Sequence, residues 1–64
     1  GDRLDLNTAT EAELRALPGI GEAKAAAIVA YREAHGGFSS VEELLQVKGI
    51  GEKILAGLRD HVCI

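Results

Sequence analysis

The residues most suited to binding chemistry are two short glycine-rich segments, Gly19-Ile20-Gly21 and Gly49-Ile50-Gly51. Glycine has no Cβ and adopts positive φ readily, so a phosphate can approach its backbone closely. Each segment stands before a sequence typical of a helix, and the first N–H groups of a helix have no intrahelical acceptor. These N–H groups and the helix dipole attract anions. The two segments therefore predict two phosphate sites built from backbone N–H groups.

The predicted sites extend to the residues around each turn. The isoleucine between the glycines is expected to point inward and hold the turn closed, while the following N–H groups point outward. Three lysines stand in or just after the turns, where they add positive charge. Glu22 and Glu52 are favoured by the helix dipole but stand beside the expected phosphates. The complete candidate set is Gly19, Gly21, Glu22, Ala23, Lys24, Lys48, Gly49, Gly51, Glu52 and Lys53.

The two turns belong to one pattern that occurs twice. Residues 10–22 resemble residues 40–52, with Glu, Leu, Gly, Ile, Gly and Glu at equivalent places. A single Gly-x-Gly also fits a tight turn that binds no ligand, but two copies favour paired anion sites. Two copies are too few for a solenoid, so they predict two similar units packed about a pseudo-twofold axis. We expect one domain, residues 1–64, with a first unit at about 8–35, a linker at 36–39 and a second unit at about 40–62.

Helices must position these turns, and the sequence predicts four of them. Thr10 with Glu13, and Ser40 with Glu43, each fit a capping box. In such a box the hydroxyl accepts from the third helical N–H and the glutamate accepts from the N–H of the cap residue. We predict helices at about 10–17, 21–35 (ended by Gly36-Gly37), 40–47 and 51–62, no strand, and hence an all-α fold.

The composition fits a small helical domain and excludes several functions. Hydrophobic residues make up 47% of the 64 residues, with one Phe and one Tyr, so the core must be built from Ala, Leu, Ile and Val. No apolar run approaches the roughly 18 residues of a membrane span, and no catalytic set, metal site or cofactor site is evident. The single cysteine, Cys63, has no partner for an internal disulfide. Because the sequence begins without Met, we expect it to be a piece of a longer protein.

The net charge of −3 opposes nucleic-acid binding when it is taken alone. The positions of the charges reduce this objection. At 1.5 Å per residue, the predicted first helical turns lie roughly 10 Å from the glycine turns, which is about one Debye length at 0.1 M salt. We therefore expect the acidic total to weaken phosphate binding without preventing it. The residues concerned are Glu11, Glu13, Glu42 and Glu43.

The other polar and aromatic residues are predicted to be structural. Tyr31 is expected to pack the long helix against its neighbour, and Phe38 to anchor the linker in the core. His35 and His61 fall near helix C-termini, where such side chains are common, and no partner is spaced for metal binding. The residues expected to be solvated helix charges are Arg15, Arg32 and Arg59.

Residues 17–21, Leu-Pro-Gly-Ile-Gly, followed by Ala25 and Ile28, resemble the helix–hairpin–helix motif. The run from Asn7 to Lys53 resembles the DNA-binding domain of the ComEA family of competence proteins, and the resemblance covers about residues 4–62. It implies a compact tandem helix–hairpin–helix fold that binds double-stranded DNA at the minor groove without sequence preference. The family's phosphate contacts carry over to Gly19, Gly21, Gly49 and Gly51, and its basic side chains to Lys24 and Lys53.

The resemblance also implies where the longer protein acts. Its members are tethered in the bacterial cell envelope and capture DNA for uptake, so other DNA-uptake proteins are expected partners. Lys48 stands where the first unit has Pro18, and Leu55 where it has Ala25, which leaves open whether the hairpins bind equally. Two alternatives remain: a fragment of a DNA repair enzyme, or a module for protein–protein contacts. The lysines near the turns disfavour the second, because the core of a protein interface is depleted of Lys.

Overall fold

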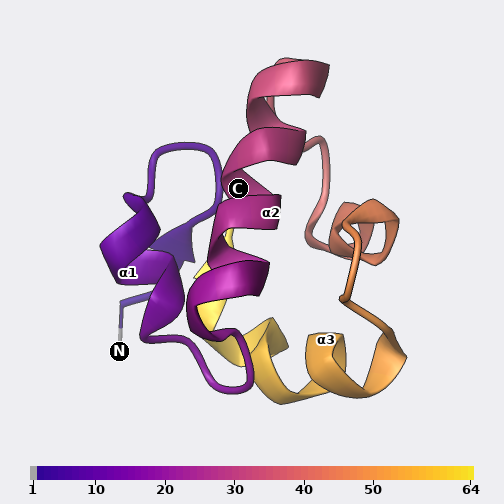
Figure 1. The fold of residues 1–64 in the computed structure, drawn as a ribbon. Coiled ribbons are helices and arrows are strands. Elements are labelled where there is room, and N and C mark those ends of the chain that lie inside the picture. Colours follow the sequence, from indigo (N-terminus) through magenta and orange to yellow (C-terminus); the bar gives the residue numbers. More distant parts are fainter. Residues whose placement is uncertain (1) are drawn as a thin grey trace.

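A computed structural model describes residues 2–64. The long helix α2 runs through the middle, with α1 on one side, the 3₁₀ helix η1 on the other, and α3 across its beginning (Figure 1). This arrangement confirms the all-α class. The elements are β1 (Leu4–Asp5), α1 (Glu11–Arg15), α2 (Gly21–His35), η1 (Val41–Gln46), α3 (Glu52–Leu58), the 3₁₀ helix η2 (Arg59–His61) and β2 (Val62–Cys63).

One short strand pair adds to the helices. β1 and β2 pair in parallel, with Leu4 opposite Val62 and Asp5 opposite Cys63. The backbone N–H of Leu6 also donates to the carbonyl of Cys63 at 2.8 Å. The expectation of no strand was wrong here, because two residues are too few to show the alternation by which strands are recognised. The pair holds the two ends of the described chain together.

The first unit follows its predicted pattern closely. The Glu13 N–H donates to Thr10 Oγ1 at 3.1 Å, and the Thr10 N–H donates to Glu13 Oε1 at 2.9 Å. This reciprocal pair confirms the first capping box. α1 ends two residues earlier than predicted, because the next N–H groups turn back three residues rather than four. α2 has the predicted bounds and ends at Gly36, whose φ is +73°.

The second unit departs from its prediction. Residues 41–46 form a 3₁₀ helix rather than an α-helix, and Ser40 makes no side-chain cap. The second capping box was wrong because both carboxylate oxygens of Glu43 accept from other donors. The Tyr31 hydroxyl donates to one at 2.6 Å, and the Ser39 N–H donates to the other at 2.8 Å. The predicted helix 51–62 is also divided, into α3 and η2.

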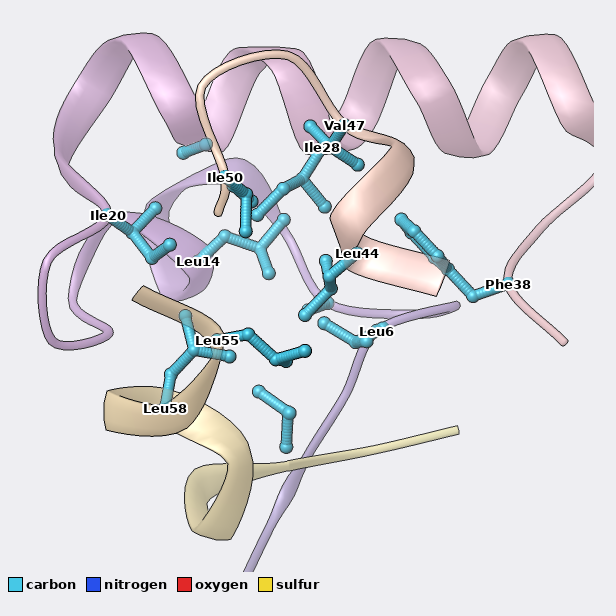
Figure 2. Packing of buried hydrophobic residues seen from close by; sticks show 13 residues of the cluster. Leu6, Leu14, Ile20, Ile28, Phe38, Leu44, Val47, Ile50, Leu55 and Leu58 are labelled. Atoms are coloured by element: carbon cyan, nitrogen blue, oxygen red, sulfur yellow. The ribbon is translucent and has the colours of Figure 1, made fainter. Parts of the chain in front are cut away.

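The core lies between the two units and is apolar throughout. Ile20 and Ile50, the residues between the glycines, both point into it and are 4% and 5% exposed, which confirms their predicted role (Figure 2). Phe38 is also buried and anchors the linker, as expected. Burying each Leu or Ile contributes about 1.5–3 kcal/mol to folding. The cluster consists of Leu6, Ala9, Leu14, Ile20, Ala25, Ile28, Phe38, Leu44, Val47, Ile50, Leu55, Leu58 and Val62.

Arg32 fastens the segment before α1 to the long helix. Its guanidinium Nη1 donates to the carbonyl of Leu6 at 2.9 Å and to that of Ala9 at 2.8 Å. The prediction of a solvated helix charge was therefore wrong. The partners are more than twenty residues away in the chain, so no local pattern indicates them.

Candidate nucleic-acid interface

Two similar hairpins join the helices. The first hairpin is residues 17–21, between α1 and α2, and the second is residues 47–51, between η1 and α3 (Figure 1). In each, the N–H of the central isoleucine donates to the carbonyl three residues earlier, at 3.2 Å in the first hairpin and 3.1 Å in the second. Gly19 has φ +75° and Gly49 has φ +90°. The turn itself requires these two glycines, because other residues rarely adopt positive φ.

The second glycine of each hairpin has a different role. Gly21 keeps a positive φ of +66°, whereas Gly51 has φ −108° and ψ −173°, extended backbone that any residue can adopt. The positive φ that glycine permits is therefore not used at Gly51. A Cβ at either position would meet nothing within 4 Å. Neither conformation nor internal packing requires glycine at position 51, and the space beside its backbone is open.

The helix starts beside the hairpins leave backbone donors available. Ile20 and Gly51 occupy the N-cap positions of α2 and α3 and have no side-chain oxygen that could accept from the first helical N–H groups. No cap side chain therefore accepts a hydrogen bond from these N–H groups, and the residues that carry them, 21–23 and 51–53, are exposed. Nine of the ten candidate residues are exposed, and Lys24 alone is half-buried: Gly19, Gly21, Glu22, Ala23, Lys48, Gly49, Gly51, Glu52 and Lys53 form the exposed set.

The half-buried Lys24 lies against the other unit's hairpin. A Cβ at Gly49 would be 3.6 Å from Lys24 Cγ and 3.7 Å from Lys24 Cε. By its place in the sequence Lys24 belongs to the first hairpin, because it follows Gly21 by three residues. The structure instead places the stem of this lysine beside the second hairpin.

Among the described residues near the hairpins, an arginine forms an ion pair but the lysines do not. In the first hairpin region, Arg15 Nη1 lies 3.6 Å from Glu22 Oε2. Within residues 2–64, no carboxylate lies within 4.0 Å of a lysine ammonium. The candidate lysines are therefore available to an external anion. Arg15 is exposed, as expected of a solvated helix charge, and it also forms this ion pair.

Other acidic groups are held by hydrogen bonds at the start of η1. The Arg59 guanidinium donates to Glu42, and this bond lowers the pKa of the Glu42 carboxyl. The Tyr31 hydroxyl and then the Ser39 N–H lower the pKa of Glu43. The same bond to Glu43 raises the pKa of Tyr31 above its ordinary value of 10.0. These bonds confine two carboxylates to one helix start.

An aromatic stack accounts for the predicted packing of Tyr31. The centroid of its ring lies 4.0 Å from the ring centroid of His35 and 5.1 Å from that of Phe38, and both pairs of rings are close to parallel. Together with the bond to Glu43, the stack joins α2 to the linker and to η1. Tyr31 therefore packs the long helix against its neighbour, as expected.

The sequence of almost the whole chain matches a known family. Residues 1–63 match the family described as the helix-hairpin-helix motif. This chain belongs to that family. The match spans both hairpins and confirms the resemblance drawn from residues 17–21 and their repeat.

Individual relatives cover almost the whole chain. It is 52% identical over 62 residues to an uncharacterized protein of Haemophilus influenzae and 41% identical over 64 residues to ComE operon protein 1 of Bacillus subtilis. It is also 48% identical over 63 residues to human endonuclease/exonuclease/phosphatase family domain-containing protein 1. The aligned parts cover 95%, 100% and 98% of this chain but only 55%, 31% and 11% of those relatives, respectively.

Residues 2–64 contain no group of three His, Cys, Asp or Glu side chains arranged to hold a metal ion. No helix among them is both long enough and apolar enough to cross a membrane.

Proposed function

We propose that this domain binds double-stranded DNA without sequence preference, by accepting phosphates at its two hairpins. The observation that carries the proposal is the open, unstrained backbone of Gly51, where glycine serves no internal purpose. A ligand that must come close to the backbone explains glycine at such a place. Phosphate is that ligand because the neighbouring helix start offers N–H donors.

The pairing of the hairpins supports a duplex as the partner. Gly19 and Gly49 both have positive φ at the same place in two similar units, so the two hairpins turn alike at their first glycine. A duplex offers two phosphate strands on either side of a groove, which suits two like sites. Backbone N–H groups and lysines bind phosphates but carry no information about base sequence. Sequence-independent binding follows from this set of contacts.

The wider role follows from the relatives. One relative is named ComE operon protein 1, and this likeness supports a role as the non-catalytic DNA-receptor module of a longer DNA-uptake protein. We propose that the longer protein is anchored in the bacterial cell envelope and works with other DNA-uptake proteins. The phosphate contacts are assigned to Gly19, Gly21, Gly49 and Gly51, with the adjoining residues of the candidate set around them.

A second candidate role differs only in the longer protein. The 48% identity to a relative named for an endonuclease/exonuclease/phosphatase domain supports a parent enzyme that uses this module to hold DNA. The aligned region is 11% of that relative, so any catalysis would belong to the remainder of such a parent. Both candidates make the same prediction for this domain.

Fluorescence anisotropy with labelled oligonucleotides tests the proposal. We expect unrelated duplexes of equal length to bind within a few-fold of one another. If about four phosphates are neutralised, the plot of log K against log salt should slope by roughly −3.6. A hundred-fold preference for one sequence, or no binding to any duplex at low salt, would contradict the proposal. Single-stranded oligonucleotides of the same length provide the comparison for strand preference.

A further inference from the structure

The two units touch one another through equivalent residues. Gly19 of the first hairpin faces Ile54 of α3, because a Cβ at Gly19 would lie 3.9 Å from Ile54 Cγ2. Gly49 of the second hairpin faces Lys24 of α2 in the same way. In the repeat, Lys24 and Ile54 occupy the same place. The contacts are therefore reciprocal, but one is apolar and the other carries a cation.

The stem of Lys24 leads its charge toward the second hairpin. The aliphatic stem of a lysine can lie on apolar or backbone surface while its ammonium stays in water. The Cγ and Cε atoms of Lys24 both lie beside Gly49, so most of the stem follows the second hairpin. Packing of this kind has already removed part of the stem's rotational freedom, which lowers the entropy lost on binding an anion.

The two hairpins consequently differ in charge. The second hairpin has Lys48 within it and Lys53 just after it, both exposed. Lys24 adds a third cation from the other unit. Near the first hairpin, the cation Arg15 is already paired with the exposed carboxylate of Glu22.

We propose that Lys24 acts across the pseudo-twofold axis, as a phosphate-binding residue of the second hairpin rather than of its own. This inference rests on the proposed function, since it needs DNA at the hairpins. One strand of the duplex then meets three lysines at the second hairpin. The other strand meets mainly backbone N–H groups at the first, and the two sites bind unequally.

Two matched substitutions test this assignment. Lys24→Ile copies the residue of the equivalent position, so it keeps the packing on Gly49 and removes the charge. Ile54→Lys makes the reverse change and adds a cation beside Gly19. Each phosphate contact changes log K by about 0.9 for a tenfold change in salt, so at 0.1 M salt one contact raises the affinity about eight-fold over its value at 1 M salt. We expect an eight-fold loss for Lys24→Ile and an eight-fold gain for Ile54→Lys.

The decisive measurement repeats both changes in a Gly51→Val background, where the second hairpin is blocked without backbone strain. There, Lys24→Ile should alter the affinity by less than about two-fold, whereas Ile54→Lys should keep its full gain of about eight-fold. A full loss for Lys24→Ile in this background would overturn the inference and leave the proposed function standing. Failure of the unchanged domain to bind duplex DNA would overturn the proposed function itself. Circular dichroism and thermal unfolding should show the native helical content in every variant.

Discussion

The two units build the same turn at Gly19 and Gly49 from unlike surroundings. The first unit places it between an α-helix with a complete capping box and an α2 of 15 residues. The second places it between a 3₁₀ helix and an α3 of 7 residues. The turn survives this difference because Gly19 and Gly49 fix it locally. A turn that is set by one glycine and one buried isoleucine depends little on the type or length of the helices around it.

The units also teach where glycine is needed for shape and where it is not. Positive φ at Gly19, Gly21 and Gly49 gives a conformational reason for glycine. Gly51 has no such reason, and the space around it is open. In the second hairpin, Gly49 is needed for the fold and Gly51 only for the proposed binding. In the first hairpin, Gly21 has both a conformational reason and a proposed binding role.

The largest effect should come from Gly51→Val. Its side chain would stand where a phosphate approaches, and the loss of one charge-assisted hydrogen bond costs about 1.5–3 kcal/mol. Duplex affinity should therefore fall about ten-fold or more. The melting temperature should stay close to that of the unchanged domain, since φ −108° suits valine.

Gly21→Val is the matched variant for the first hairpin. A β-branched residue held at φ +66° costs roughly 1–2 kcal/mol, so this variant should lose both stability and affinity. Anisotropy and thermal unfolding measure the two effects separately. Near-normal affinity in a folded Gly51→Val variant would remove the second hairpin from the binding site.

The next effect concerns the two expected capping boxes. Thr10→Ala removes a cap that accepts a hydrogen bond at 3.1 Å and should cost about 1 kcal/mol of unfolding free energy. Ser40→Ala removes a side chain that makes no cap hydrogen bond, so its cost should stay within about 0.5 kcal/mol. Urea denaturation provides both values. Equal losses would mean that Ser40 caps its helix in solution.

A smaller effect is expected from the glutamates beside the hairpins. Glu52→Gln removes a negative charge next to the second hairpin and should strengthen DNA binding about two-fold at low salt, as for unit charges roughly 8 Å apart in water. Glu22→Gln should give a similar gain and also release Arg15 from its ion pair. Both gains should shrink as salt is added. A gain that persists at high salt would point to a structural cause instead.

The smallest effect should appear in the acid titration of Glu43. Its folded pKa is lowered below 4.5, chiefly by the Tyr31 hydroxyl. A carboxyl with a lowered pKa adds stability above its unfolded pKa, and this contribution is lost as pH falls through the folded pKa. Tyr31→Phe should raise the pKa of Glu43 and so reduce the stability that the domain loses as the pH falls. NMR titration of the carboxyl carbon measures the shift, and an unchanged pKa would show that the Ser39 N–H alone holds it.

Local patterns predicted the parts of the fold that depend on near neighbours. The Thr10 capping box, the bounds of α2, its end at Gly36 and the inward isoleucines all follow from residues within a few places in the chain. The candidate glycines were found in the same way. Their contact with DNA stays a prediction until binding is measured.

Contacts between distant segments decided the rest, and no local pattern contains them. Glu43 lost its capping role because Tyr31, twelve residues earlier, donates to its carboxylate. Arg32 found acceptors at Leu6 and Ala9 only after the chain had folded back. In the same way, the sequence alone determined that Lys24 would follow the first hairpin, and only the packing of the two units brought its side chain to the second.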